Sequence, residues 1–191
     1  MPYDGARFFV LNIEMTIEQL KDNIRVIEDF PRPGIHFQDV TTLFMNAECL
    51  QDLSKRLYDL YKDKGITKVV GLESRGFIMG GILAEKLGAG FVPARKQGKL
   101  PGEKISETYE LEYGTDTIEL HTNCIGPDDI VLIHDDLLAT GGTMAAASRL
   151  ISQFSPKKIY LNAIIELTGC PKLDVFPRNL DLETIIKIDE A

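Results

Sequence analysis

The stretch Val131-Leu-Ile-His-Asp-Asp-Leu-Leu-Ala-Thr-Gly-Gly-Thr143 decides the fold of this chain. Its first half is an apolar run that predicts a buried strand over residues 130–134, with Asp135 and Asp136 at its carboxyl end. A short turn with two glycines follows, and a helix is predicted over residues 143–154. A strand that leads through a tight loop into a helix is the first half of a βαβ unit.

The turn after this strand is typical of a site that binds an anion. Its two glycines permit backbone conformations that other residues disfavour, so successive N–H groups can converge on one point. The start of the following helix adds free N–H donors and the positive end of the helix dipole, and two threonines add hydroxyl donors. We therefore predict a phosphomonoester site made of Ala139, Thr140, Gly141, Gly142 and Thr143.

Asp135 and Asp136 need a partner other than the phosphate, because carboxylates repel it. Ribose hydroxyls and a hydrated Mg²⁺ ion are the groups that two adjacent carboxylates suit, the metal being held through water. A phosphate site next to a diol site describes ribose 5-phosphate. The alternative is an ordinary turn and helix N-cap, which gives no reason for two acids at the end of an apolar strand. The chain contains neither a P-loop nor a strand followed by GxGxxG.

Strands alternate with helices along most of the chain. A capping box at Thr16 predicts a helix that continues to Ile27. The other predicted elements are a helix from Asn46, strands over residues 67–72, 91–94 and 158–165, a helix over 76–87, and a candidate last strand over 182–188. This order predicts an α/β fold with a mainly parallel twisted sheet flanked by helices.

Composition limits the classes of partner. The formal net charge is −8, from 21 basic and 29 acidic side chains, and a surface of this sign repels the backbone of DNA and RNA. The three cysteines have no metal-binding spacing and are expected to be reduced thiols. No signal peptide or membrane-spanning stretch is visible, so no membrane association is expected and the expected location is the cytoplasm.

Residues 131–143 resemble the phosphoribosyl pyrophosphate signature of the type I phosphoribosyltransferases. Four further stretches narrow the resemblance to the members of that family that act on adenine: Phe30-Pro-Arg-Pro-Gly-Ile-His-Phe-Gln-Asp39, Gly71-Leu-Glu-Ser-Arg-Gly-Phe77, Arg95-Lys-Gln-Gly-Lys-Leu-Pro101 and Tyr109-Glu-Leu-Glu-Tyr-Gly114. It runs from about residue 16 to about residue 168. The chain departs from the family at His134, usually apolar, and at Gln97, often a proline.

The resemblance implies a reaction of purine salvage, in which adenine and phosphoribosyl pyrophosphate give AMP and pyrophosphate with Mg²⁺ as cofactor. It also implies a homodimer and a single domain over residues 1–191. Within that domain we expect an N-terminal helix and hood loop over about residues 1–45. Two strand-like runs that flank Gly114 and Thr115 predict an inserted β-hairpin over about residues 103–122, which would act as a flexible lid.

Basic residues near the predicted strand ends are candidates for binding the pyrophosphate group. Any one of them alone would be read as a solvated surface charge, but their grouping in an acidic chain favours a binding role. The resemblance places both basic loops on pyrophosphate and leaves open whether one acts across a subunit boundary. The predicted residues are Ser74, Arg75, Arg95, Lys96, Lys99 and Tyr113.

The base site is less visible in the sequence. Phe37 suits either stacking on a purine face or packing in the core. By resemblance, backbone groups near His36 and Gln38 hydrogen-bond the adenine edge and Leu167 packs against the base. Glu112 is expected to be a catalytic acid–base group, although a lone Glu on an exposed hairpin is usually only solvated. Asp135 and Asp136 are counted as catalytic with it through their place beside the ribose and the metal.

Two other functions remain open at this stage. The same reaction on hypoxanthine, guanine or xanthine would need a different hood loop. A regulatory protein that binds phosphoribosyl groups without catalysis would normally carry a DNA-binding module, and about 15 residues before the first predicted helix are too few for one.

Overall fold

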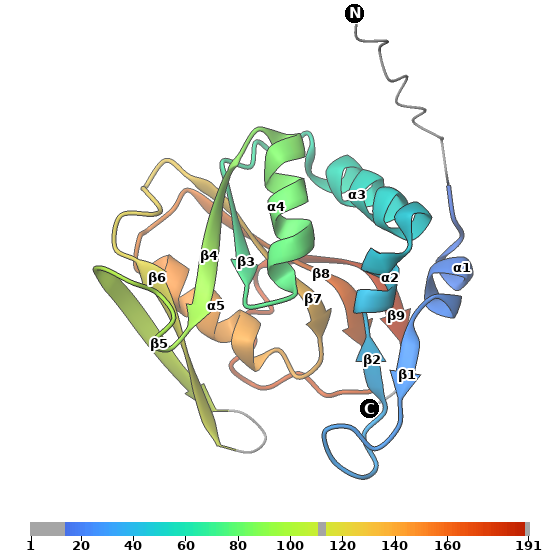
Figure 1. Cartoon of the computed structure of the whole chain (residues 1–191). Helices are drawn as coiled ribbons and strands as arrows, with labels where there is room; N and C mark the ends of the chain where they lie inside the picture. The colour runs from blue at the N-terminus through green and yellow to red at the C-terminus, as the bar shows by residue number, and fades with distance from the viewer. Residues whose placement is uncertain (1–13, 111–113, 190–191) are drawn as a thin grey trace, which may run out of the picture.

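The computed structural model describes residues 14–110 and 114–189. Its helices and strands in chain order are α1 (Ile17–Asp22), β1 (Arg25–Ile27), β2 (Phe37–Asp39), α2 (Thr41–Met45), α3 (Ala47–Tyr61), β3 (Lys68–Leu72), α4 (Gly76–Leu87), β4 (Gly90–Lys96), β5 (Lys104–Glu110), β6 (Thr115–His121), β7 (Ile130–Leu138), α5 (Gly142–Ser152), β8 (Lys158–Leu167) and β9 (Asp181–Ile188). Figure 1 shows their arrangement around one large sheet.

The large sheet has seven strands in the order β5-β6-β4-β3-β7-β8-β9 (Figure 1). The five strands from β4 to β9 in this order pair in parallel, and Val70 at the centre of β3 lies opposite Val92 on β4 and Ile133 on β7. The hairpin of β5 and β6 adds an antiparallel edge. The predicted α/β fold with a mainly parallel sheet and an inserted hairpin is therefore confirmed.

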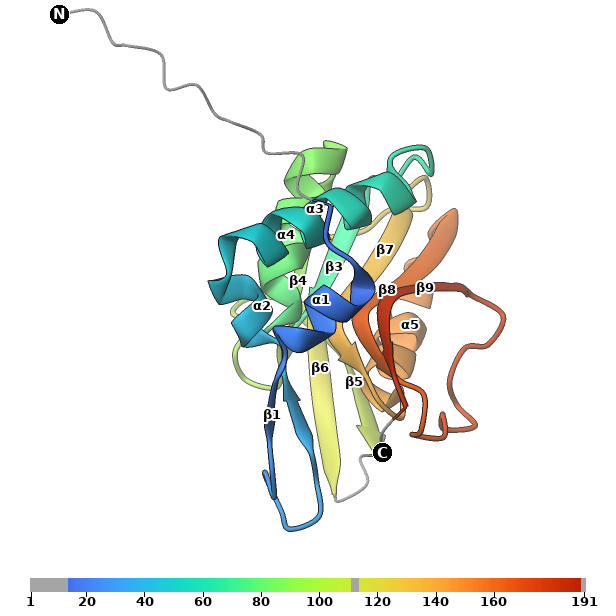
Figure 2. The same cartoon turned by 90° about the vertical axis from the view of Figure 1, so that its right-hand side faces the viewer.

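Helices cover both faces of the sheet. Figure 2 shows α1, α2, α3 and α4 on one face and α5 on the other. Successive residues of a strand point to opposite faces, and on β7 Leu132 belongs to the core under α3 and α4 whereas Ile133 belongs to the core under α5. Both side chains are fully buried, so β7 is anchored from both sides. No helix in the described residues is both long and apolar enough to cross a bilayer.

The first helix is shorter than the sequence pattern predicts. The capping box at Thr16 forms, but α1 ends at Asp22, and the N–H of the following Asn23 donates to the carbonyl of Leu20. The chain then turns into β1, whose β-branched Val26 and Ile27 favour an extended backbone. The prediction of one helix continuing to Ile27 was wrong because apolar spacing does not distinguish a helix from a helix followed by a short strand.

Strand β7 is longer than predicted. It continues through the acid pair to Leu138, which pairs with Glu166 on β8. Asp135 and Asp136 thus lie within the strand and not after it, because the pairing with β8 continues beyond them at Leu137 and Leu138.

Two hairpins extend beyond the carboxyl edge of the sheet. Figure 1 shows the β1–β2 hairpin on one side of this edge and the β5–β6 hairpin on the other. The β1–β2 hairpin carries the predicted hood loop, in which the rings of Phe30 and Phe37 meet edge to face with centroids 5.1 Å apart. The carboxyl ends of β3, β4 and β7 lie between the hairpins, where open parallel sheets bind their ligands.

Candidate active site

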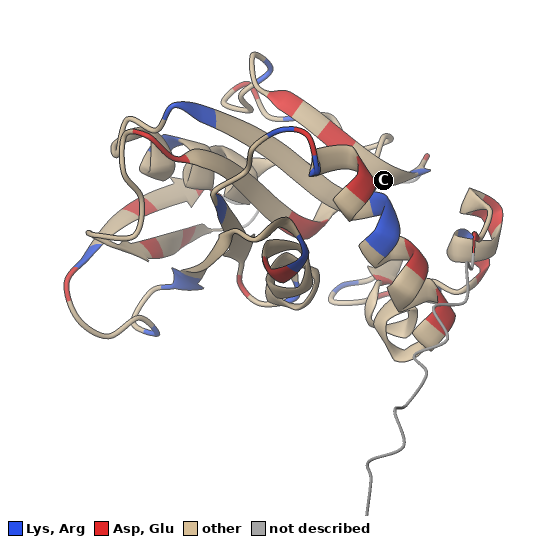
Figure 3. Cartoon of the chain, turned by 90° about the horizontal axis from the view of Figure 1, so that it is seen from above, with Lys and Arg blue, Asp and Glu red and all other residues tan. Residues whose placement is uncertain are grey.

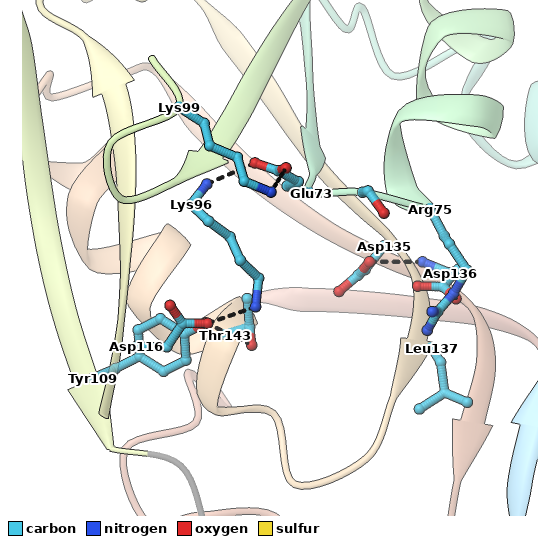
Figure 4. A pocket seen from close by; sticks show the side chains of 11 residues that line it. Glu73, Arg75, Lys96, Lys99, Tyr109, Asp116, Asp135, Asp136, Leu137 and Thr143 are labelled. Carbon is cyan, nitrogen blue, oxygen red and sulfur yellow. Dashed lines mark hydrogen bonds and ion pairs between the residues drawn. The ribbon is translucent and has the colours of Figure 1, made fainter. Parts of the chain in front are cut away.

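A cavity of about 450 Å³ lies at this carboxyl edge (Figure 4). It is lined by Glu73, Ser74, Arg75, Lys96, Lys99, Tyr109, Asp116, Asp135, Asp136, Leu137 and Thr143. A second cavity of about 130 Å³ is formed by Asp135 and residues 137–144. Asp135, Leu137 and Thr143 line both cavities, so the two are adjacent parts of one site.

The acid pair forms the floor between the two cavities. Asp136 is buried and forms an ion pair with Arg75, which follows β3. Asp135 accepts a hydrogen bond from the N–H of Asp136 at 2.9 Å, and within the described residues it has no ion pair. Burial and the negative charge of Asp136 raise the pKa of Asp135 well above its usual value. Arg75, whose ion pair is with Asp136, only partly opposes this rise.

The glycine turn has the geometry of an anion cradle. Gly141 has a φ of +83°, a left-handed conformation that glycine adopts easily, and it caps the start of α5. The N–H of Ala145 makes the first helical bond, to the carbonyl of Gly141 at 2.9 Å. The three preceding N–H groups are the free donors of the helix start. They belong to Gly142, Thr143 and Met144, which all line the smaller cavity.

One carboxylate organises the basic loop after β4. Glu73 accepts hydrogen bonds from Arg95 Nε at 3.0 Å, from Lys99 Nζ at 2.8 Å and from the backbone N–H of Lys96 at 2.8 Å. Burial alone would raise the pKa of Glu73, but these three donors outweigh it and hold the pKa at about 2. Glu73 is therefore ionised and ties the loop after β3 to the loop after β4.

A second chain of contacts joins the hairpin to the glycine turn (Figure 4). Lys96 Nζ lies 2.7 Å from Asp116 on β6, which also accepts a hydrogen bond from the hydroxyl of Tyr109 on β5 at 3.4 Å. The Thr143 hydroxyl donates in turn to the Tyr109 oxygen at 3.1 Å. The hairpin is therefore held against both the basic loop and the start of α5.

Most of the predicted residues come together in this site. Ser74, Arg75, Lys96, Lys99, Asp135, Asp136 and Thr143 line the larger cavity, and Ala139, Thr140, Gly141 and Gly142 line the smaller one. Lys and Arg are interspersed with Asp and Glu over the described chain (Figure 3), and the larger cavity likewise brings three cations together with four carboxylates.

Other predicted residues lie elsewhere. Arg95 does not line the cavity, because it pairs with Glu73 and its guanidinium lies 5.8 Å from the ring centroid of Phe77. The predicted base-binding residues also line neither cavity, although the ring of Phe37 lies 5.5 Å from the guanidinium carbon of Arg75. They are His36 and Phe37 in the hood, buried Gln38 on β2, and Leu167 at the end of β8. Glu112 and Tyr113 fall outside the described residues.

Sequence reasoning missed four residues of the larger cavity, one of which is Leu137 on β7. Glu73 stands in a motif quoted for its cations, and Tyr109 and Asp116 stand in strand-like runs of the hairpin. The pairing of Tyr109 with Asp116 across β5 and β6 brings both toward Thr143, and no local sequence signal reports this contact.

Comparison with known proteins agrees with this geometry. The model of the phosphoribosyl transferase domain family matches residues 39–178. The adenine phosphoribosyltransferase of Phocaeicola vulgatus is 60% identical over 174 residues, which cover 91% of this chain and all of that protein. The chain belongs to the adenine phosphoribosyltransferases. The family membership and the purine salvage activity predicted from the sequence are thereby confirmed.

Solved structures of adenine phosphoribosyltransferases share the fold. That of the enzyme from Rhodothermus marinus is 47% identical with a TM-score of 0.84, covering 90% of this chain and 98% of that chain. The Giardia lamblia enzyme, in complex with 9-deazaadenine, is 41% identical with a TM-score of 0.86, covering 92% of this chain and 99% of that chain. Adenine phosphoribosyltransferases thus resemble this chain along almost their whole length.

Proposed function

We propose that the two adjacent cavities are the active site in which this chain converts adenine and phosphoribosyl pyrophosphate to AMP and pyrophosphate. One observation carries the assignment: Asp135 and Asp136 lie on β7 between a glycine turn that suits a phosphate and two loops whose cations suit a pyrophosphate. The complex of the Giardia lamblia relative with an adenine analogue supports adenine as the base.

The ribose 5-phosphate occupies the smaller cavity in this proposal. The 5-phosphate accepts hydrogen bonds from the N–H groups and hydroxyls of residues 139–143, whose turn has the required left-handed glycine. The ribose hydroxyls then face Asp135 and Asp136, the nearest acceptors between the two cavities.

The pyrophosphate group occupies the larger cavity. Ser74, Arg75, Lys96 and Lys99 line it and supply hydroxyl and cationic donors. Arg95 acts behind them, because its ion pair with Glu73 holds the end of β4 and the loop after it, which carry Lys96 and Lys99. Tyr113 is assigned to the same group by family resemblance alone.

The acid pair fits an Mg²⁺ ion that arrives with the substrate. Asp135 has no ion pair among the described residues, and burial and Asp136 raise its pKa, so a cation beside it would favour its ionised form. The described residues contain no cluster of three or more His, Cys, Asp or Glu that would hold a metal by protein ligands alone. This suits Mg²⁺, which usually keeps several waters and takes further oxygens from substrate phosphates. When bound there, the ion would neutralise charge on the departing pyrophosphate.

The residues of the chain contribute mainly position and electrostatics. Bond breaking at the anomeric carbon runs ahead of bond making, so the cations stabilise the leaving charge while the turn fixes the sugar in line with the base. The hairpin of β5 and β6 closes as a lid to keep water from the activated sugar. Phe37 and the backbone at His36 and Gln38 hold adenine, Leu167 packs against it, and Glu112 manages the proton of the attacking ring nitrogen.

We also propose a cytoplasmic homodimer. The family resemblance supports the dimer, and three free thiols at Cys49, Cys124 and Cys170 support a reducing compartment. Sedimentation velocity on the purified chain tests the dimer, and a monomer at micromolar concentration would contradict it.

A turnover assay with a panel of bases tests the proposed reaction. We expect AMP from adenine and phosphoribosyl pyrophosphate with Mg²⁺, and little product from hypoxanthine, guanine or xanthine. The double variant Asp135→Asn/Asp136→Asn should lower kcat/KM by about a hundredfold or more, because it removes both carboxylate charges beside the ribose. The exposed Asp128→Asn is the matched control and should retain wild-type turnover.

The acid pair, the base and the catalytic activity are each contradicted by a different result. Near wild-type turnover in the double variant would remove the acid pair from the reaction. Preference for another purine would change the base, and tight binding of phosphoribosyl pyrophosphate without AMP formation would favour a regulatory protein. Circular dichroism confirms that each variant is folded.

A further inference from the structure

The segment between β8 and β9 crosses the outside of the glycine turn. The N–H of Leu173 donates to the carbonyl of Thr140 at 3.0 Å, and the N–H of Phe176 donates to the carbonyl of Leu173 at 3.0 Å. The side chain of Phe176 is only 8% exposed, whereas its neighbour Val175 is 58% exposed. The segment thus turns one aromatic ring inward, next to the turn assigned to the 5-phosphate.

Phe176 packs directly on Gly141. A Cβ atom added to Gly141 would lie 2.4 Å from Cδ2 of the phenylalanine ring, so the ring occupies the space beside the α-carbon. Leu173 approaches Gly142 in the same manner, its Cδ1 lying 3.3 Å from an added Cβ. Neither Phe176 nor Leu173 lines the two cavities. Both side chains therefore contact the turn from the side away from the proposed phosphate.

The hairpin confines the same turn at a second point. The carbonyl oxygen of Glu110 lies 3.4 Å from a Cβ added to Gly142, and Cδ2 of Tyr109 lies 3.7 Å from it. The turn is thus held between the β5 strand and the segment that carries Phe176. Glycine has the most backbone freedom to lose, so a turn with two glycines needs such packing to keep its N–H groups aimed at one point.

We propose that Phe176 is a positioning residue for the 5-phosphate: its ring fixes the conformation of Gly141 and so preorganises the phosphate-binding N–H groups. It does not touch the substrate. Removing the ring leaves every phosphate donor in place but lets the turn sample conformations in which the donors diverge, which weakens binding. This inference rests on the proposed function, because it takes residues 139–143 to bind the 5-phosphate.

Calorimetry with three separate probes tests the role of Phe176. Ribose 5-phosphate and AMP carry the 5-phosphate, whereas pyrophosphate does not. Phe176→Ala should raise the Kd for ribose 5-phosphate and for AMP by about tenfold to a hundredfold, since small displacements of binding groups have effects of this size. The Kd for pyrophosphate should stay within about twofold. Phe176→Leu should show a smaller change in the same direction, and Val175→Ala is the matched control without effect.

The outcomes distinguish a failure of the positioning role from a failure of the proposed function. Unchanged affinity of folded Phe176→Ala for ribose 5-phosphate, or an equal loss for pyrophosphate, would overturn the positioning role. If Phe176→Ala does not fold, Phe176→Leu carries the same comparison, and wild-type affinities in that variant would overturn the role as well. Failure of the wild-type chain to bind ribose 5-phosphate would overturn the proposed function itself, whatever the variants show.

Discussion

At the scale of single residues, His134 is the unusual group of the site. It is fully buried on β7 next to the acid pair. The amide nitrogen of Asn162 donates to the carbonyl of Glu183, so its oxygen faces His134 Nδ1 at 2.7 Å and Nδ1 carries the hydrogen. Nε2 has no partner within the described residues. Burial lowers the pKa of His134 to about 4, against the weaker raising effects of Asn162 and Asp136.

This low pKa predicts a loss of stability in mild acid. The usual pKa is 6.5, so as the pH falls the unfolded chain takes up the proton first. The free energy of unfolding is therefore unaffected by this proton above pH 6.5. It falls between pH 6.5 and 4, by about 3 kcal/mol in total. Urea unfolding across this range should show the slope in the wild type. His134→Leu should lose it, and the surface variant His36→Gln should keep it.

If His134→Leu shows the same pH slope as the wild type, His134 is already protonated or hydrated in the folded chain. The pH slope is the informative quantity, since the variant also loses the hydrogen bond to Asn162, which changes its stability independently of pH.

The same scale shows what the sequence reveals about the site. That the glycine turn and the acid pair lie together in one site was predictable, because glycines, threonines and two acids follow one apolar run. Glu73 was not, because its role depends on Arg95 and Lys99, more than 20 residues away in the chain and brought near only by parallel pairing. The predicted base-binding residues and Glu112 remain predictions that a complex with adenine would test.

At the scale of elements, the contact between α4 and β7 positions the acid pair. Gly76 is the first residue of α4, and a Cβ added there would lie 2.8 Å from the carbonyl oxygen of His134 and 3.1 Å from Oδ1 of Asp135. Only glycine allows the helix start to approach the strand so closely. The glycine therefore sets the distance between the loop that carries Arg75 and the strand that carries its partner Asp136.

We expect Gly76→Ala to lower the free energy of unfolding by about 1–3 kcal/mol and to reduce turnover, because the added methyl group pushes α4 away from Asp135. Gly81→Ala in the same helix is the control. A Cβ at Gly81 meets nothing within 4 Å, so this variant should gain about 0.5–1 kcal/mol from helix propensity. Chemical denaturation and steady-state kinetics measure both effects. Equal stability of the two variants would contradict the close approach.

Element boundaries were predictable where local signals end an element. The predicted bounds of α4 agree with the structure because Gly88 takes a left-handed conformation at its end, and α3 starts after the N-cap Asn46 as expected. The strands β1 and β2 were missed, since three residues each are too few to show a period, and they form only by pairing with one another.

At the scale of the whole molecule, two cores share one sheet. Neighbouring residues of β7, Leu132 and Ile133, point into opposite cores and are both fully buried. Neither layer of helices can separate without exposing the strand that bears the acid pair. The molecule should therefore unfold as one cooperative unit.

Truncation of either side chain tests this cooperativity. Leu132→Ala and Ile133→Ala should each lower the free energy of unfolding by about 2–5 kcal/mol. Each should shift the same single transition, whether it is followed by circular dichroism or by tyrosine fluorescence. Val175→Ala, at an exposed position, should change stability by less than about 0.5 kcal/mol. Two separate transitions in either core variant would show that the two layers unfold independently.

The pairing of the basic side chains in and behind the larger cavity has a consequence for selectivity. Arg75, Arg95, Lys96 and Lys99 each hold a carboxylate of the chain itself. An incoming anion must exchange with these internal partners, and chloride or a single phosphate ion offers too little charge to compensate for releasing them. A ligand with several linked phosphoryl oxygens can replace more than one partner at once. We therefore expect simple salts to bind weakly in this cavity while no substrate occupies it.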